Sequence, residues 1–267
     1  MIGVFDSGYG GLTIFRDIEK KLPQYSYIYL GDNARAPYGD LSQKLIYQYS
    51  QKAVDYLMAE GCQLIIFACN TASAMALRKL QQEYLPAKYP GKNVLGVIRP
   101  LVESVVELAQ RSRVGVMATA STVKSEAYVN EFSHLDCSIE VFQESCPLLV
   151  PLIEASRENS PETNIILTEY IRPLKRVGLD TVVLGCTHYG FLQEAIEKSF
   201  GVNVRVLRSG QIIADKLADY LKRHPEYNHP VQNPTQTFLT TGDNKKFDQA
   251  AQKFLGRAIN SLTIKLK

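Results

Sequence analysis

The chain has 267 residues, of which 45% are hydrophobic and 21% charged, and 30 Lys and Arg residues against 27 Asp and Glu residues give a net charge of +3. This composition is ordinary for a folded protein of one large or two medium domains, and it excludes a disordered chain. Because no block of basic residues and no apolar run of about 18 residues is present, we expect neither a nucleic acid partner nor a membrane span.

Short runs of β-branched or apolar residues recur along the chain and predict strands. The predicted strands are Ile2–Phe5, Tyr27–Gly31, Leu64–Ala68, Val94–Ile98, Val114–Ala118, Ile139–Phe142, Thr181–Leu184, Val202–Leu207 and Thr237–Thr240. Between them, apolar residues at helical spacing predict helices, as at Ile46, Tyr49, Ala53 and Leu57, and at Phe247, Ala251, Phe254 and Ala258. This alternation predicts an α/β protein with mainly parallel sheets covered on both faces.

Two pairs of segments resemble each other at nearly the same offset. Residues 3–7 resemble residues 115–119, an offset of 112 (115 minus 3), and Cys69 with its strand resembles Cys186 with its strand, an offset of 117 (186 minus 69). Chance similarity of buried strands is the alternative, but the cysteines favour two similar doubly wound α/β domains. If the last helix and strand return to the first half, the first domain comprises residues 1–95 and 209–267, and the second residues 96–208.

The chain begins with an apolar segment and has no basic region before it. We therefore expect no signal peptide and a cytoplasmic location, where thiols stay reduced. The five cysteines are odd in number, which argues against a disulfide framework. Cys62, Cys137 and Cys146 lie beside predicted elements in positions typical of small buried or surface residues.

Cys69 and Cys186 differ from the other cysteines. Each ends an apolar strand, precedes hydroxyl or amide side chains, and opens a predicted helix. A helix N-terminus and nearby donors lower the pKa of a thiol from about 8.5, so we expect a thiolate to be accessible near neutral pH. Structural zinc sites use closely spaced ligand pairs, which neither cysteine has, and His188 alone among the histidines lies near one of them. We therefore predict reactive thiols and no metal.

Two other turns follow predicted strands. The glycine-rich turn after Asp6 matches neither nucleotide-binding fingerprint, but its backbone amides suit a small anion such as a carboxylate. Because Asp6 would repel a phosphate, a base or orienting role is favoured. Pro37, Tyr38 and Gly39 follow the second strand. They form either a functional turn or a plain turn without a role in binding.

Five segments together resemble the cofactor-independent glutamate racemases of the aspartate/glutamate racemase family. They are Gly3–Leu12, Gly31–Asp32 with Pro37–Gly39, Ala68–Ala72, Thr119–Val123 and Leu184–Tyr189. They run from near residue 3 to about residue 190 in family order. The resemblance implies two α/β domains that face each other, an active site in the cleft between them, and isomerase activity with no cofactor.

The resemblance also implies residue roles. Cys69 would take the α-proton of D-glutamate and Cys186 that of L-glutamate, with Asp6 assisting Cys69 and His188 assisting Cys186. The implied contacts to the amino and α-carboxylate groups are Ser7, Asn70, Thr71 and Thr187. Those to the rest of the substrate are Pro37, Tyr38, Gly39, Thr119 and Thr122.

The leading interpretation is interconversion of L- and D-glutamate, which supplies D-glutamate for peptidoglycan and so for the cell wall and cell shape. A racemase of aspartate or another amino acid, or a catalytically silent amino-acid-binding protein, are the alternatives. Arg99, Gly190 and Arg208 depart from the family pattern and put interdomain contacts and substrate preference in doubt. The sequence leaves the oligomeric state open, with a homodimer as one alternative.

Overall fold

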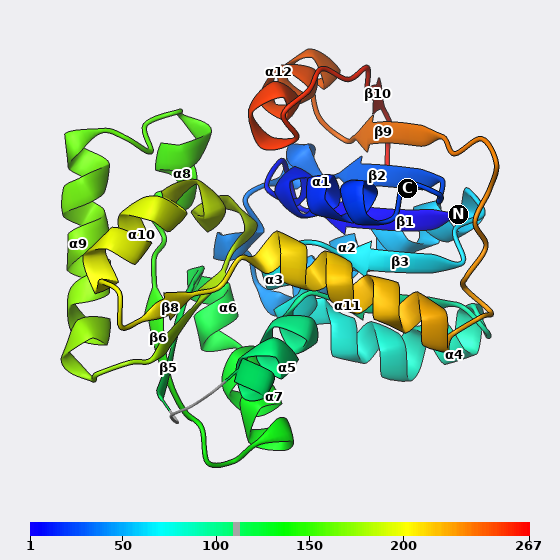
Figure 1. Cartoon of the computed structure of the whole chain (residues 1–267). Helices are drawn as coiled ribbons and strands as arrows, with labels where there is room; N and C mark the ends of the chain where they lie inside the picture. The colour runs from blue at the N-terminus through cyan, green and yellow to red at the C-terminus, as the bar shows by residue number, and fades with distance from the viewer. Residues whose placement is uncertain (109–112) are drawn as a thin grey trace.

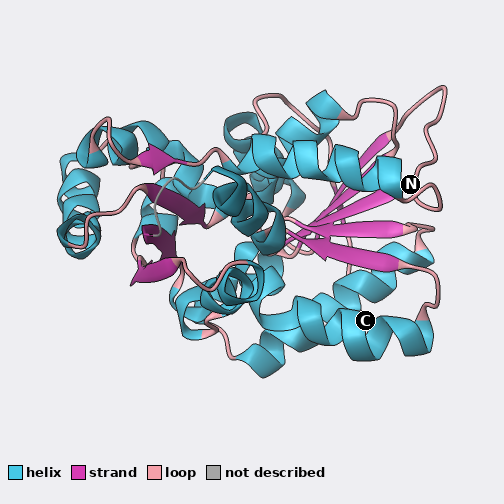
Figure 2. Cartoon of the chain, turned by 60° about the horizontal axis from the view of Figure 1, so that its bottom comes forward, coloured by secondary structure: helices cyan, strands magenta, loops and turns pink. Residues whose placement is uncertain are grey.

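The computed structural model describes residues 1–108 and 113–267, whose strands form two separate parallel sheets (Figure 1). The larger sheet has the order β10-β9-β2-β1-β3-β4, and the smaller has the order β6-β5-β7-β8. Helices surround each sheet, and the carboxyl ends of the larger sheet's strands point toward the lobe that holds the smaller one (Figure 2). The predicted α/β class is confirmed.

The larger sheet is built around its first strand. Its members are β1 (Ile2–Asp6), β2 (Tyr27–Gly31), β3 (Leu64–Phe67), β4 (Asn93–Gly96), β9 (Gln236–Thr240) and β10 (Leu262–Thr263). β1 pairs with β2 and β3, and all three strands are buried along their length. This agrees with their nearly continuous apolar sequences, because parallel strands are covered on both faces. β9 and β10, from the end of the chain, pair beside β2.

Helices of the first lobe cover this sheet. They are α1 (Gly11–Lys21), α2 (Gln43–Ala59), α3 (Asn70–Ala72), α4 (Leu85–Lys88), α11 (Ser209–Arg223) and α12 (Asn244–Phe254). π-helical turns over 73–77 and 80–84 join α3 to α4, so the chain is helical from Asn70 to Lys88, with Cys69 as the residue that precedes the helix. α11 packs against α1, and Ser42 caps the predicted helix α2 through its side chain.

The second lobe holds the smaller sheet and the chain's middle helices. Its strands are β5 (Arg113–Ala118), β6 (Glu140–Ser145), β7 (Thr181–Gly185) and β8 (Arg205–Val206). Its helices are α5 (Ile98–Leu108), α6 (Ala120–Lys124), α7 (Ala127–Leu135), α8 (Leu149–Glu154), α9 (Pro161–Arg176) and α10 (Gln193–Phe200). Short 3₁₀ segments cover Asn33–Arg35, Tyr38–Asp40 and Thr187–Leu192.

Several predicted boundaries are wrong. The strand expected to reach Ile98 ends at Gly96, and Ile98 instead begins α5. The strand expected from Val202 is reduced to β8, because Val202 is fully exposed and has no neighbouring strand surface to cover it. The last predicted helix stops at Phe254 rather than at Ala258.

No helix within residues 1–108 and 113–267 is both long enough and apolar enough to cross a bilayer.

Candidate active site

The predicted functional residues gather where the two lobes meet. Asp6 ends β1, Cys69 follows β3, and Cys186 follows β7 of the other sheet. The hydroxyls of Thr71 and Thr119, one from each lobe, lie 2.9 Å apart. The carboxyl ends of strands are where parallel sheets bind ligands. The structure therefore brings residues from both predicted halves to one place.

The first half-site is built around Cys69, which is buried at the start of the helical segment. Its thiol donates to Ser7 Oγ at 3.4 Å and accepts from the backbone N–H of Ala72 at 3.4 Å. Asp6 is buried nearby, and its Oδ2 accepts from the backbone N–H of Gly8 at 2.9 Å. Its Oδ1 finds no hydrogen-bond partner among residues 1–108 and 113–267. A free carboxylate oxygen thus stands beside the thiol.

The second half-site is built around Cys186. Its Sγ lies 3.8 Å from Nδ1 of His188, two residues later. The other ring nitrogen, Nε2, lies 3.0 Å from Oε1 of Glu154 at the end of α8. His188 is buried, and the ring of Phe254 meets it edge-on with centroids 5.3 Å apart. The thiol, imidazole and carboxylate therefore form a line of three groups that can exchange protons.

Glu154 is a site residue that the sequence pattern does not reveal. In the sequence it only ends the apolar run Cys146–Ile153. It lies 32 residues before Cys186 (186 minus 154), and no motif spacing connects the two. The packing of α8 against the 3₁₀ turn that holds His188 brings them together. That contact is tertiary, so no local signal marks it.

The expectation of readily ionised thiols is wrong for this geometry. Burial raises the pKa of Cys69 to about 11, and the carboxylate of Asp6 adds to the shift. Burial also raises the pKa of Cys186, although the backbone N–H of His188 opposes it. Burial raises the pKa of Asp6 as well, and His188 opposes that shift. Desolvation thus outweighs the helix N-terminus, and a thiolate needs a nearby positive charge to form.

A cluster of hydroxyls spans the two lobes. The Oγ1 atom of Thr119 lies 2.9 Å from that of Thr71 and 3.0 Å from that of Thr122, and Thr71 and Thr122 lie 3.3 Å apart. Beside them, the hydroxyl of Tyr128 donates to Oδ1 of Asn70 at 2.7 Å. Thr71, Thr122 and Asn70 are buried. These predicted substrate contacts therefore face one another across the interface.

The loop of Tyr38 and Gly39 closes another side of the site. The phenol of Tyr38 is buried and donates to Oδ2 of Asp32 at 2.5 Å, so its hydroxyl is already engaged. The carbonyl of Gly39 accepts from the hydroxyl of Ser121 in the second lobe at 2.6 Å. Pro37 is exposed at the start of this loop. The loop therefore presents its backbone, rather than the Tyr38 hydroxyl, to the space between the lobes.

Thr187, the remaining predicted contact, lies between Cys186 and His188. Its backbone carbonyl accepts from the hydroxyl of Thr13 of α1 at 3.3 Å. A methyl group added to Gly10 would lie 2.1 Å from the Thr187 hydroxyl, so only glycine fits there. The Cys186 turn is thus seated tightly against the first lobe.

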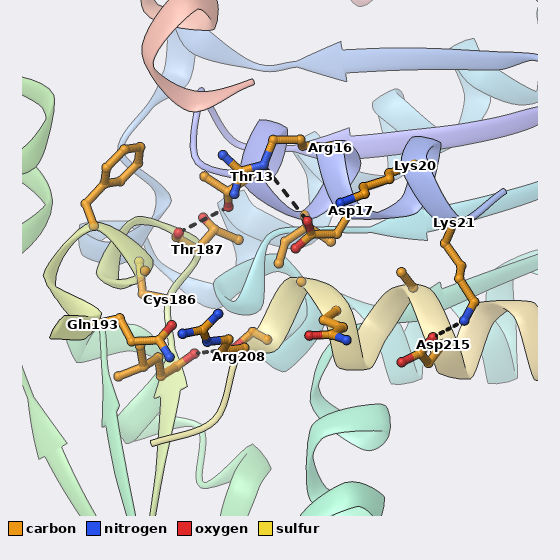
Figure 3. A pocket seen from close by; sticks show the side chains of 18 of the residues that line it. Thr13, Arg16, Asp17, Lys20, Lys21, Cys186, Thr187, Gln193, Arg208 and Asp215 are labelled. Carbon is orange, nitrogen blue, oxygen red and sulfur yellow. Dashed lines mark hydrogen bonds and ion pairs between the residues drawn. The ribbon is translucent and has the colours of Figure 1, made fainter. Parts of the chain in front are cut away.

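A cavity of about 690 Å³ opens beside the second half-site, between α1, α10 and α11 (Figure 3). Cys186 and Thr187 are among the residues that line it. Gly190 and Arg208, two of the three departures from the family pattern, line it as well. These two departures thus lie next to the Cys186 turn.

The third departure, Arg99, does not line this cavity and lies on α5 of the second lobe. It forms ion pairs with Glu103 at 2.9 Å and with Glu131 of α7 at 2.8 Å. Its side chain is 60% exposed. Arg99 therefore joins two helices on the surface of the second lobe.

Comparison with known proteins gives a consistent result over nearly the full chain. Residues 2–217 match the family model for Asp/Glu/hydantoin racemase. A glutamate racemase of Desulforudis audaxviator is 36% identical over 269 residues, which cover 98% of this chain and 96% of that protein.

Solved structures agree with the sequence relatives. A glutamate racemase from Bacillus anthracis superposes with a TM-score of 0.93 at 33% identity and covers 100% of this chain and 97% of its own. A glutamate racemase from Francisella tularensis, solved in complex with D-glutamate, has a TM-score of 0.89 at 32% identity, with coverage of 99% and 97%.

Proposed function

The chain belongs to the Asp/Glu/hydantoin racemase family, and from that premise we propose that it interconverts L- and D-glutamate by passing the α-proton between two thiols. One observation carries the proposal. Cys69 and Cys186 follow strands of different sheets, and each has its own proton-accepting group, Asp6 for one and His188 for the other.

Two thiols on opposite walls suit racemisation. The reaction removes the α-proton from one face of the amino acid and returns a proton to the other face. Cys69 as thiolate takes the proton of D-glutamate, and Cys186 as thiol donates one to the opposite face. In the reverse direction Cys186 is the thiolate and Cys69 the donor. The assignment of each thiol to an enantiomer rests on the family resemblance.

The partners of the thiols explain how a thiolate forms at a site that disfavours it. The ammonium group of glutamate brings a positive charge between the thiols, and a nearby opposite charge favours an ionised thiol. The free oxygen of Asp6 accepts the proton that leaves Cys69. His188, oriented by Glu154, accepts the proton that leaves Cys186. Both transfers are general acid–base steps.

The α-carbanion-like state needs stabilisation that the thiols do not supply. We propose that the amino and α-carboxylate groups of the substrate are bound by polar groups that are held in the buried site, those of Ser7, Asn70, Thr71 and Thr187. Donors that are already oriented in a site without water stabilise developing charge strongly. The substrate is therefore held where the charge develops.

The side-chain carboxylate of glutamate lies toward the loop of Pro37, Tyr38 and Gly39. Because the Tyr38 hydroxyl is bonded to Asp32, the backbone amides of this loop are the donors we propose. Thr119 and Thr122 complete that end of the pocket. The distance from the thiols to this end sets the length of the substrate.

We further propose the discontinuous division at residues 95/96 and 208/209, supported by the pairing of β9 with β2. We also propose that the product supplies D-glutamate for peptidoglycan, and that the enzyme acts in the cytoplasm, where its thiols stay reduced. The homodimer stays a prediction that sedimentation velocity tests.

Exchange of the α-proton in deuterated water tests the activity and the substrate together. L-Glutamate should gain α-deuterium while the circular dichroism of the solution decays to zero, with no added metal or pyridoxal phosphate. L-Aspartate and L-glutamine, run in parallel, should react far more slowly. Absence of exchange with all three would leave an amino-acid-binding protein, and faster exchange of aspartate would reassign the substrate.

A further inference from the structure

The end of α12, which packs with the first lobe, contacts the second lobe beside the Cys186 half-site. Lys253 Nζ donates to the backbone carbonyl of Ile153 at 2.6 Å, to Ser156 Oγ at 3.3 Å, and to Glu158 Oε2 at 2.9 Å. All three acceptors lie at or just after the end of α8. Ile153 directly precedes Glu154, the carboxylate that holds His188.

This ammonium group is unusually well satisfied. A lysine has three N–H donors, and here three acceptors receive them. The Lys253 side chain is 22% exposed and that of Glu158 is 16% exposed, so the ion pair is screened little by solvent. Forming such a pair costs side-chain conformational entropy and desolvation free energy, so it forms only with a specific geometry. The contact therefore fixes the end of α8 rather than adding a loose surface charge.

Aromatic rings complete the same contact. The ammonium of Lys253 lies 5.1 Å from the ring centroid of Phe191 and 5.8 Å from that of Phe254. Phe254 meets Phe191 edge-on at 4.8 Å and His188 edge-on at 5.3 Å. Phe254 is buried. The imidazole is thus held by Glu154 on one nitrogen and by Phe254 against its ring.

We propose that Lys253 is a positioning residue of the Cys186 half-site: it holds the end of α8 so that Glu154 keeps His188 turned toward the thiol. The inference rests on the proposed racemisation. It adds a residue that never touches the substrate and that comes from the opposite lobe. Contact between the lobes is therefore coupled to the proton-transfer groups of one thiol.

The overall rates of racemisation cannot show which of the two thiols a variant affects. The two enantiomers have equal free energy in solution, so any variant must have the same kcat/KM in both directions. A deuterium isotope effect does distinguish the two thiols. α-Deuterated L-glutamate reports the step at one thiol and α-deuterated D-glutamate the step at the other. Raising one barrier increases the isotope effect measured from its own side and decreases the effect measured from the opposite side.

The test compares Lys253→Met with Lys246→Met, which removes an exposed lysine from the same helix. Lys253→Met should lower kcat/KM on the order of 10-fold, since small misplacements of reacting groups reduce rates strongly. Its isotope effects should shift in the same sense as those of His188→Gln and opposite to those of Asp6→Asn. Lys246→Met should match the parent enzyme, and Lys253→Arg should recover part of the loss.

An unchanged rate for Lys253→Met, or a lower rate with isotope effects like the parent's, would overturn the inference. If Lys253→Met does not fold, Glu158→Gln tests the same contact, because it removes the ion pair and leaves the other two acceptors. Its isotope effects should shift in the same sense by a smaller amount, and a shift in the opposite sense counts against the proposal. A parent enzyme that fails to racemise glutamate would reject the proposed function instead.

Discussion

The two half-sites present the same thiol with different partners. Beside Cys69 stands Asp6, a buried carboxylate from the neighbouring strand with one free oxygen. Beside Cys186 stands His188, held by Glu154 from α8 and by Phe254 from the other lobe. Cys69 therefore has one ionisable side chain beside it, whereas Cys186 has a chain of contacts that reaches across the interface.

This difference separates what the fold supplies from what individual residues supply. In both lobes a cysteine closely follows the end of a buried parallel strand, so the repeated architecture explains where the thiols lie. The groups beside the thiols come from non-equivalent elements: Asp6 from a strand end in one lobe, and His188 with Glu154 from a turn and a helix end in the other. On the proposed mechanism, the two proton transfers should therefore have barriers that can be changed separately.

Removing either thiol should have the largest effect. Cys69→Ser and Cys186→Ser should each lower racemisation on the order of 10³-fold, because a hydroxyl is a much weaker acid at neutral pH and one acid–base partner is lost. The thiol that remains should still exchange the α-proton of one enantiomer with solvent, without inversion. Proton NMR in deuterated water follows the exchange, and circular dichroism follows the inversion.

The two serine variants should select opposite enantiomers. Cys186→Ser, which keeps Cys69, should exchange D-glutamate, and Cys69→Ser should exchange L-glutamate. Far-UV circular dichroism like that of the parent serves as the folding control. Exchange of both enantiomers by one variant would contradict the division of labour between the thiols.

Removing the partners should have a smaller effect that shows their separate roles. Asp6→Asn and His188→Gln should each lower kcat/KM about 10²-fold, the lower range for a positioned acid–base group. Asp6→Asn raises the barrier at Cys69, so the isotope effect should rise with α-deuterated D-glutamate and fall with L-glutamate. His188→Gln should do the reverse. If Asp6→Asn and His188→Gln shift the isotope effects in the same direction, the two half-sites are not independent.

Glu154→Gln should lower kcat/KM less than His188→Gln does, because Glu154 acts through His188. The amide keeps an oxygen near Nε2 but loses the charge that stabilises a protonated imidazole, so we expect a loss of about 10-fold. If Glu154 works only by holding His188, the double variant with His188→Gln should be no slower than His188→Gln alone. Steady-state kinetics of the four proteins measure this coupling, and additive losses would give Glu154 an independent role.

The cysteines, Asp6 and His188 are predictable from sequence for a physical reason. A parallel strand buried on both faces has a continuous apolar run, so the polar residues that end it stand out, and such ends form the ligand edge of the sheet. This logic locates both thiols and the polar residues at the strand ends, whereas the roles of Asp6 and His188 come from the family resemblance and stay proposals. The same repeated pattern predicts two α/β halves, and the boundaries between them stay a proposal.

The features that sequence does not reveal depend on tertiary packing. Glu154 and Lys253 reach their positions through the ends of two helices that come from different lobes. β10 is a two-residue exposed edge strand with no apolar run to mark it. The direction of the Cys69 pKa shift is missed because a helix N-terminus is visible in the sequence, whereas the depth of burial is not.

The smallest effect we predict is on stability at high pH. The Cys69 thiol is neutral when protonated, and burial raises its pKa from an ordinary 9.0 to about 11. Below the unfolded pKa both states keep the proton, and the contribution of the thiol to stability is fully present. Between these values the unfolded chain releases the proton and the folded chain retains it, so stability falls by up to about 1.4 kcal/mol per pH unit.

Cys69→Ser lacks this titration, so its stability deficit relative to the parent should narrow as the pH rises. Urea unfolding at about pH 8 and about pH 10.5 measures the deficit, and its linear extrapolation resolves a change of this size when both proteins share one m-value. The stability deficit of Cys186→Ser should also narrow as the pH rises, because burial raises the pKa of that thiol as well. A deficit that stays constant for Cys69→Ser would mean that Cys69 ionises as readily in the fold as in the unfolded chain. If the deficit of Cys186→Ser narrows at the same time, the two half-sites differ in desolvation as well as in their partners.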